Sequence, residues 1–518
     1  MSEAVYSLSI SPRGEDWKTF DRHDCVYLKQ VVYCARPMNP EVQSMNIFVP
    51  KEYITSTGGV NAQGRRGAFT ALTAPIILSN TIAAYAEGKP RMIGDHGCEE
   101  AGEYVEAGMI YVSCGARGKE SQIGETYIGK APAGLVDLKA GVRFLKHNAG
   151  NLPGDVNRII SLGVSAGGAM SSLLGVTGNG KEFLPWLEAI GAAMDVGDDV
   201  YASQCYCPIT NLEHADAAYE WSFMGNYKTE DFMKGPMELT PFEQALSDQL
   251  GARFPAYFNS LGLKHPETGK PLTLDGQGQS GSGYDYLMEL LEASAKKHLA
   301  LIAASSPKVS VSVSLSDYLN GRYKRYRKTP KGPMEFPGQD KSRWLSGSGN
   351  GVSITSLADM KNGYWERMKG CAAFDRLEMD GRNENQLFGN ETVSAVHFSE
   401  DVKEAVAALS PSFPQEADRY GQLYASVGAD ERVEALKKLM NPMNYAAGKA
   451  DTDVAPHFRI RVGSVDAHTS FLISMMLTLE LKKNSKTDVD YAIAWDADHG
   501  ACDYPGEFVD WVRKITAL

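Results

Sequence analysis

Arg158-Ile-Ile-Ser-Leu-Gly-Val-Ser-Ala-Gly-Gly-Ala-Met170 is the stretch of this sequence that decides the fold. A short apolar run, residues 159–162, leads into Gly163-Val-Ser165-Ala-Gly167, and small residues follow. Strand, Gly-x-Ser-x-Gly and helix in that order form a nucleophile elbow, a sharp turn that lifts a serine hydroxyl above a sheet. Glycines flank the serine because side chains there would collide with the neighbouring strand and helix. We therefore predict Ser165 as a catalytic nucleophile.

Strands and helices alternate on both sides of this turn. Further strands are predicted at residues 74–78, 107–113, 200–208, 457–463 and 489–495. Helices are predicted at residues 134–146, 471–483 and 507–515, and two apolar runs at 25–28 and 45–50 indicate an opening antiparallel hairpin. Such alternation indicates a mostly parallel, doubly wound sheet with right-handed crossovers.

The alternation is interrupted for about half of the chain. Residues 211–455 read mainly as helices and irregular loops, with helices expected at 242–263, 284–304, 402–409 and 432–440. The sequence therefore predicts an α/β-hydrolase core made of residues 1–210 and 456–518. Residues 211–455 would form a mainly helical lid that covers the active site.

Length, composition and charge limit the classes of protein to which this chain can belong. The 518 residues are too many for one ordinary domain, and 43% hydrophobic with 22% charged residues is typical of a soluble globular protein. A net charge of −12 argues against a nucleic-acid partner. We see neither a membrane span nor a signal peptide, and expect a cytoplasmic protein unless a leader has been removed. The eight cysteines are expected to be reduced and mostly buried.

A serine hydroxyl becomes a good nucleophile only when a base takes its proton and an acid holds that base in the right tautomer. In an elbow-type enzyme the acid and then the histidine follow the serine, each on a loop after a strand. Asp466 follows the strand at 457–463 and His499 the strand at 489–495, at the sheet edge that carries Ser165. We predict His499 as the base and Asp466 as its orienting acid.

The same two loops contain other groups of the right type. Asp496 or Asp498 could serve as the acid, and His468 as the base. The sequence leaves these alternatives open.

Two sets of N–H groups are expected to stabilise the oxyanion that forms during acyl transfer. One is the backbone N–H of Ala166, directly after the nucleophile. The other should come from the loop Ser79-Asn80-Thr81 after the strand at 74–78. We take Asn80 as the candidate, although the loop does not single out one donor.

Three other motifs have simpler explanations. Gly276-Gln-Gly-Gln-Ser-Gly281 matches a dinucleotide-binding pattern, but no strand–helix–strand unit surrounds it, so a flexible loop is expected. The basic run Arg322–Lys328 is interpreted as a solvated face of the lid rather than a nucleic-acid site. Glu213-His-Ala-Asp216 lacks a second set of metal ligands and is interpreted as the first turn of the lid, with Asp216 lining the pocket. We expect no metal and no cofactor.

Several motifs together resemble the bacterial tannase and feruloyl esterase-like α/β-hydrolases. They are spread over most of the chain: Gly-Val-Ser165-Ala-Gly-Gly, Cys-Pro-Ile-Thr-Asn-Leu-Glu-His-Ala-Asp216, Glu384-Asn-Gln-Leu-Phe-Gly389, Gly-Ser-Val-Asp466 and Trp-Asp-Ala-Asp-His499. The resemblance implies an esterase that cleaves esters of hydroxylated aromatic acids through an acyl-enzyme, without a cofactor. It implies a small-molecule aromatic ester as the partner; the oligomeric state cannot be read from the sequence.

The resemblance also implies how the acid part of the substrate is bound. In that family a lysine and a glutamate of the lid bind phenolic hydroxyls, and Lys369 and Glu384 are the matching residues here. A further family aspartate lies two residues after the triad acid, where this chain has His468. A carboxylate accepts hydrogen bonds from phenols, whereas a neutral imidazole accepts only one and can also donate. This departure leaves room for hydroxycinnamate or simpler acyl esters.

Other functions are open at this stage. A serine peptidase or a broad-specificity carboxylesterase would use the same three residues, although peptidases of this fold commonly carry a propeller whose repeats are absent here. A non-catalytic binding protein would not need Ser165, Asp466 and His499 to be intact together.

Overall fold

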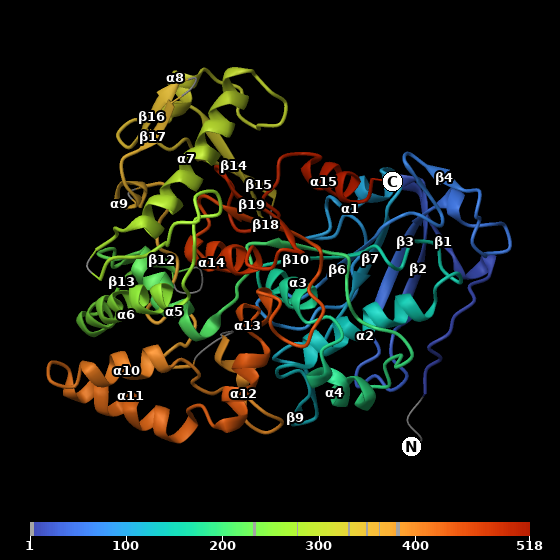
Figure 1. The fold of residues 1–518 in the computed structure, drawn as a ribbon, viewed down its shortest axis with the longest axis horizontal. Helices are drawn as coiled ribbons and strands as arrows, with labels where there is room; N and C mark the ends of the chain where they lie inside the picture. The colour runs from blue at the N-terminus through green and yellow to red at the C-terminus, as the bar shows by residue number, and fades with distance from the viewer. Residues whose placement is uncertain are drawn as a thin grey trace.

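A nine-stranded sheet forms the centre of the protein (Figure 1). The computed structural model describes residues 5–231, 235–276, 278–329, 332–348, 351–361, 363–379 and 384–517. The strand order is β1-β2-β3-β7-β6-β10-β11-β18-β19. These strands are β1 (Lys18–Phe20), β2 (Cys25–Val32), β3 (Ser44–Pro50), β6 (Ile76–Asn80), β7 (Ile110–Cys114), β10 (Ile159–Val164), β11 (Ala202–Tyr206), β18 (His457–Gly463) and β19 (Asp488–Ala494).

Strand directions confirm the predicted fold class. The first four strands along the sheet pair antiparallel, and all neighbours from β7 to β19 pair parallel. Buried parallel strands read as continuous apolar runs, and every residue of β6, β7 and β11 is buried. Because the parallel strands share one direction, the residues that follow β10, β11, β18 and β19 gather at one edge of the sheet.

Helices cover both faces of this sheet (Figure 1). α1 (Ala101–Glu106) and α15 (Glu507–Ile515) lie on one face, where the rings of Tyr104 and Phe508 are 5.0 Å apart. α2 (Ala133–His147) and α3 (Ala166–Val176) pack together on the other face. Two further helices, α4 (Leu184–Ala189) and α14 (Phe471–Leu481), complete the shell. Every residue of α3 is buried, which explains its small, non-amphipathic sequence.

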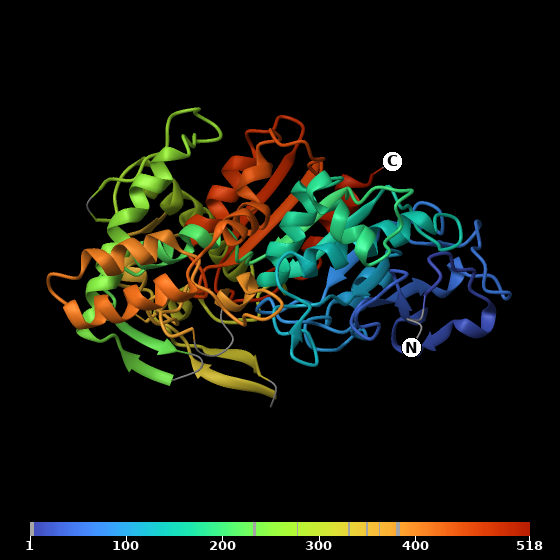
Figure 2. The ribbon, with the colours of Figure 1, turned by 90° about the horizontal axis from the view of Figure 1, so that it is seen from below.

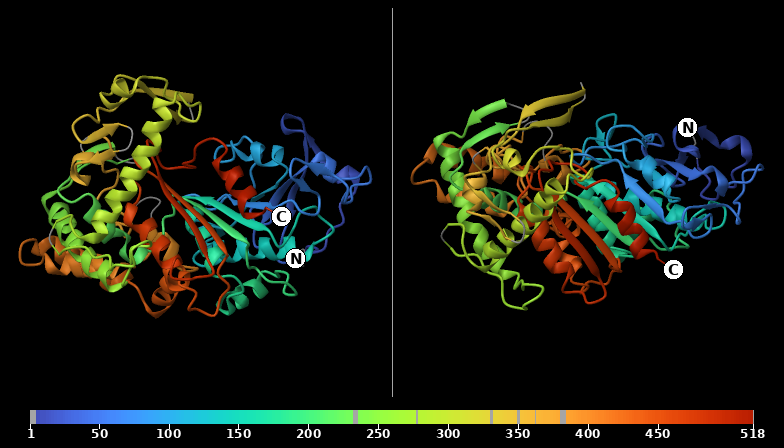
Figure 3. Two further views of the ribbon diagram at one scale, coloured as in Figure 1. Left: turned by 45° about the horizontal axis from the view of Figure 1, so that its top comes forward. Right: turned by 90° about the horizontal axis from the view of Figure 1, so that it is seen from above.

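Between β11 and β18 the chain leaves the sheet and forms a large body beside it (Figures 1 and 3). The four predicted helices are found there within a few residues of their expected bounds, as α6, α7, α10 and α12. The insertion helices are α5 (Leu212–Ser222), α6 (Pro241–Ser260), α7 (Ser282–Ala303), α8 (Leu315–Leu319), α9 (Leu357–Met360), α10 (Glu400–Ala408), α11 (Pro414–Val427), α12 (Glu431–Leu439) and α13 (Met443–Ala446).

Five of these helices were not predicted, and three of them, α8, α9 and α13, have only four or five residues. α5 takes up residues that we interpreted as a single turn, and α11 was not predicted. The only buried side chains of α11 are Ala417, Tyr420 and Tyr424, so its apolar stripe is short and partly polar. Such a stripe gives only a weak helical period in the sequence.

The insertion also contains β-structure that the sequence reading missed. Three short hairpins form there: β12 (Lys228–Asp231) with β13 (Gly235–Glu238), β14 (Lys324–Thr329) with β15 (Gly332–Pro337), and β16 (Leu345–Ser348) with β17 (Gly351–Ile354). The first two project from the same side of the insertion (Figure 2). The basic run Arg322–Lys328, for which we had predicted no strand, leads into and forms most of β14.

Two general features concern the whole chain. All eight cysteines are buried and free, as expected for reduced thiols. No helix among the described residues is long and apolar enough to cross a membrane. Of the dinucleotide-like motif, Gln277 lies outside the described residues; Gly281 directly precedes α7.

Candidate active site

Ser165 lies in the turn between β10 and α3 with φ 62° and ψ −124°, a region that side chains rarely adopt. The flanking glycines make this turn possible. A Cβ on Gly163 would lie 2.1 Å from the Gly167 carbonyl oxygen, and one on Gly167 would lie 2.7 Å from Asn80 Oδ1. The collisions expected from the sequence are therefore real, and the elbow holds the Ser165 side chain partly exposed.

Neighbouring strands fix the elbow from both sides. Ser165 donates its N–H to the Tyr206 carbonyl at 2.9 Å, and its own carbonyl accepts from Ile209 N–H at 3.2 Å. Ala166 is the first residue of α3, where a backbone N–H has no partner within the helix. That N–H is thus available for an oxyanion.

Asn80 braces the same turn. Its amide donates to the carbonyls of Leu162 at 3.1 Å and Gly167 at 2.9 Å, and its Oδ1 accepts from Ile82 N–H at 3.3 Å. The oxyanion donor predicted for this loop is an N–H group and stays a prediction, whereas the Asn80 side chain is committed to the elbow. The sequence could not reveal this, because the contact joins β6 to residues more than eighty positions later.

Replacing Asn80 with alanine should therefore destabilise the protein. Two buried carbonyls lose a donor, which costs about 2–4 kcal/mol of unfolding free energy. Chemical denaturation measures the change, with Asn61→Ala as control, because the partly buried Asn61 makes a similar amide–carbonyl bond to Glu52 at 2.8 Å away from the elbow. Equal losses in the two variants would contradict this role for Asn80.

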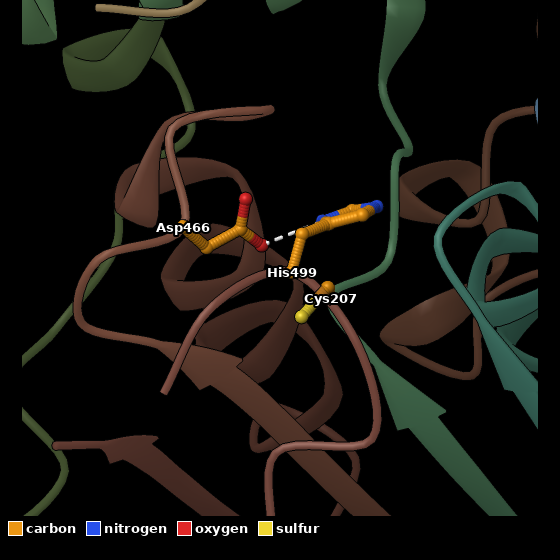
Figure 4. A group of neighbouring side chains, drawn as sticks. All are labelled: Cys207, Asp466 and His499. Atoms are coloured by element: carbon orange, nitrogen blue, oxygen red, sulfur yellow. Dashed lines mark hydrogen bonds and ion pairs between the residues drawn. The ribbon is translucent and has the colours of Figure 1, made fainter. Parts of the chain in front are cut away.

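Asp466 and His499 meet at the same edge of the sheet. Asp466 Oδ2 lies 2.8 Å from His499 Nδ1, and Asp466 Oδ1 accepts the His468 N–H at 2.9 Å (Figure 4). Burial alone would raise the pKa of Asp466, but the charge and hydrogen bond of His499 outweigh it and hold the pKa at about 2. Burial opposes a charge on His499, and the Asp466 carboxylate outweighs it, so the pKa of the imidazole is raised. The pair thus behaves as a carboxylate that stabilises an imidazolium.

The alternative groups have different surroundings. Asp496 accepts hydrogen bonds from the hydroxyls of Tyr318 and Tyr364, and lies 3.7 Å from Lys341 Nζ. Asp498 accepts the His499 backbone N–H at 2.8 Å. The His468 ring lies against the His499 ring, with centroids 4.3 Å apart and the two planes tilted by 31°. Of the three carboxylates, the geometry therefore favours Asp466 as the partner of the His499 ring.

One contact of a triad is not formed in this state of the protein. Within the described part of the chain, Ser165 Oγ makes no hydrogen bond. In ligand-free enzymes such bonds are often long and shorten only when substrate is bound.

Cys207 is a neighbour of this pair that the sequence reading missed. The Cys207 sulfur, a carboxylate oxygen of Asp466 and a ring nitrogen of His499 all lie within 4.8 Å of one another (Figure 4). We had placed Cys207 inside a strand, but β11 ends at Tyr206, so Cys207 stands in the loop at the catalytic edge. These residue types also bind soft metal ions. Here the carboxylate and imidazole are each other's hydrogen-bond partners, so we assign them to proton transfer.

The Lys369 ammonium lies within electrostatic reach of the carboxylates of Glu384 and Asp466. Burial lowers the pKa of Lys369, and the nearby carboxylates of Glu384, Asp216 and Asp466 act in the opposite direction. The Lys369 ammonium lies 3.8 Å from the ring centroid of Phe374. Both side chains are half-buried, with Glu384 at the start of a 3-10 helix.

Asp216 does not face a pocket. It is fully buried, and its two carboxylate oxygens accept the backbone N–H groups of Phe374 at 2.8 Å and Asp375 at 3.0 Å. Burial raises its pKa to about 8. Its neighbour His214 bonds to Asp401 instead, so the side chains of this motif diverge. Asp216 supports the segment that leads from Lys369, which corrects its predicted contact with substrate.

The fold and this site define the class of the protein: a serine hydrolase of the α/β-hydrolase fold. A family model described as BD-FAE, which is feruloyl esterase-like, matches residues 102–202. No curated protein matches the sequence.

Similar solved structures identify the family of this chain. A tannin acyl hydrolase is 32% identical, covers 95% of this chain and 94% of its own, and superposes with a TM-score of 0.77. The Fusobacterium nucleatum tannase is 29% identical, covers 99% of this chain and 100% of its own, and gives a TM-score of 0.77. A tannin acyl hydrolase in complex with ethyl gallate is 31% identical, covers 95% of this chain and 94% of its own, and gives a TM-score of 0.75. The chain belongs to the tannase family.

Proposed function

We propose that this protein hydrolyses esters of hydroxylated aromatic acids, with Ser165, His499 and Asp466 as its catalytic triad. The observation that carries the proposal is the 2.8 Å Asp466–His499 pair, set beside a strained serine elbow in a chain of the tannase family. Its relative bound to ethyl gallate supports an aromatic acyl group.

The reaction proceeds through an acyl-enzyme. His499 Nε2 takes the proton of the Ser165 hydroxyl as the oxygen attacks the ester carbonyl, and Asp466 holds the opposite ring N–H. The Ala166 N–H stabilises the oxyanion, and we place the second donor among the backbone N–H groups of the loop after β6 rather than on the Asn80 side chain. His499 then protonates the leaving alcohol. Water attacks the acyl-enzyme while His499 takes its proton, and the collapse of the second intermediate releases the acid and returns a proton to Ser165.

We place the aromatic acid between the triad and the insertion. Lys369 can donate to a phenolic oxygen, and Glu384 can accept from a phenolic hydroxyl. The carboxylates of Glu384 and Asp466 both act on the Lys369 ammonium, which supports placing these three residues around the acyl group. His468, whose ring lies against that of the base, would border the same aromatic ring.

A broader aromatic esterase is the second candidate, because His468 stands where the family carries a carboxylate and the BD-FAE model matches part of the core. The specificity constant kcat/KM separates the two on methyl gallate, methyl ferulate, methyl benzoate and a short aliphatic ester, with Ser165→Ala as the blank. We expect gallate to lead benzoate by tenfold or more, about 1.4 kcal/mol of transition-state binding.

The same panel tests the binding residues. Lys369→Met and Glu384→Gln should lower the ratio of kcat/KM on methyl gallate to kcat/KM on methyl benzoate. The kcat/KM on methyl benzoate itself should stay nearly unchanged. A leading rate on ferulate would favour the broader esterase. Activity on none of the four esters would contradict the proposal.

A further inference from the structure

The segment Tyr206–Ile209, at the carboxyl end of β11, connects the three loops that hold the proposed triad. Its first and last residues bond to the backbone of Ser165, as described above. Cys207 donates its N–H to the carbonyl of Arg461 at 2.7 Å, in the strand that leads to Asp466. The backbone of this segment therefore fixes the nucleophile relative to the loop that carries the acid.

The side chain of Cys207 extends this connection to the third loop. Its thiol donates to the Gly500 carbonyl at 3.4 Å and lies 3.7 Å from Cys502 Sγ, and both residues belong to the loop that follows β19. β18 separates β11 from β19 in the sheet, so no ladder of backbone hydrogen bonds joins the two strands. Tyr206 makes a second link, from its hydroxyl to Asp503 at 2.6 Å, but Cys207 is the one beside the His499 ring (Figure 4).

Cys207 holds this place in an unfavourable backbone conformation. Its φ is 44°, in the left-handed region that favours glycine, and it is fully buried. Glycine would adopt this conformation more easily, so the backbone path alone does not explain a cysteine here. The side chain must contribute, and the contacts it makes are with the histidine loop.

The chemical state of the thiol fits contact rather than reaction. Burial raises the pKa of Cys207 well above its ordinary value, Cys502 and Asp466 raise it further, and a hydrogen bond with His499 acts in the opposite direction. A protonated thiol can donate a hydrogen bond, but it is a poor nucleophile and a poor metal ligand. Cys207 therefore does not compete with Ser165.

We propose that Cys207 is a positioning residue: its side chain supports the His499 loop and sets the imidazole against Ser165. This inference rests on the proposed roles of Ser165 and His499. The thiol lies beside the His499 ring but takes part in no bond that forms or breaks in the proposed reaction, so it acts on the rate only through the base.

Cys207→Gly separates the side chain from the backbone, because glycine keeps the φ of 44° without strain. We expect kcat on the preferred ester to fall about 10- to 100-fold, the scale of a misplacement of about 1 Å, with KM changed less than twofold. The rate at which a fluorophosphonate labels Ser165 should fall by a similar factor. Cys207→Ser, which retains a donor at the same position, should recover part of both rates.

Cys205→Ala is the matched control, since Cys205 is equally buried two residues earlier in β11 and contacts Ser203 rather than the triad. All variants are compared at a temperature well below their melting points. If Cys207→Gly retains the kcat and labelling rate of Cys205→Ala, the inference is wrong. If the unmodified enzyme neither hydrolyses the esters nor reacts with the fluorophosphonate, the proposed function fails instead.

Discussion

Replacing Ser165 with alanine is expected to lower kcat by about 10⁵- to 10⁶-fold while leaving the fold unchanged. Loss of the nucleophile in other serine hydrolases has an effect of that size, and the residual rate comes from binding and the oxyanion donors. The fold should survive because the hydroxyl is partly exposed and makes no hydrogen bond within the described residues. Alanine at φ 62° is strained to a similar degree as serine, so the melting temperature should change little.

Ser172→Ala is the control for this result. Ser172 lies in α3 about two turns beyond Ser165, where its hydroxyl donates to the Ala169 carbonyl at 2.7 Å. It should keep most of the activity. An alanine variant at Ser165 that still hydrolyses the preferred ester at the wild-type rate would rule out the nucleophile assignment.

Asp466→Asn is expected to lower kcat by about 10³- to 10⁴-fold, because an amide can donate to Nδ1 and favour the wrong imidazole tautomer. It should also move the pH profile. Burial opposes the His499 charge, but Asp466 raises the pKa of the imidazole, and the base works only when neutral. Wild-type activity should therefore rise with pH through a midpoint above the ordinary 6.5 of histidine, and the midpoint for the asparagine variant should lie lower.

The competing carboxylates provide the comparison. Asp498→Asn keeps the Asp466–His499 bond and should retain a wild-type midpoint. Profiles of kcat/KM against pH for the wild type, Asp466→Asn and Asp498→Asn show which of the two carboxylates acts on His499. A larger loss in Asp498→Asn than in Asp466→Asn would transfer the acid role to Asp498.

The catalytic core was predictable because its signals are local. Continuous apolar runs mark buried parallel strands, the glycines around Ser165 mark the elbow, and chain order points to the last two loops for the acid and the base. The register confirms the direction of each strand, so residues after strand ends were correctly expected at one edge.

The contacts that cross the sheet were not predictable in this way. Asn80 bonds to an elbow some eighty residues later, and Cys207 reaches the loop of His499 across an intervening strand. Asp216 has its oxygens occupied by the backbone of Phe374 and Asp375. None of these pairings leaves a spacing or a period in the sequence, because each depends on how distant segments are brought together.

The insertion was hard to read for a different reason. Its hairpins have strands of only four to six residues, too short for a clear alternation of apolar and polar side chains. The α6 helix was recognisable because Phe242, Leu246, Leu250, Phe254 and Phe258, which are all buried, recur every four residues.

Trapping the acyl-enzyme tests the central claim most directly. The protein is mixed with methyl gallate, quenched in acid within the first turnovers, and analysed by intact-protein and peptide mass spectrometry. The account predicts one added galloyl group, carried by the peptide that contains Ser165 and absent from Ser165→Ala. Ester hydrolysis without any adduct on that peptide, or with an adduct on another residue, would contradict the account.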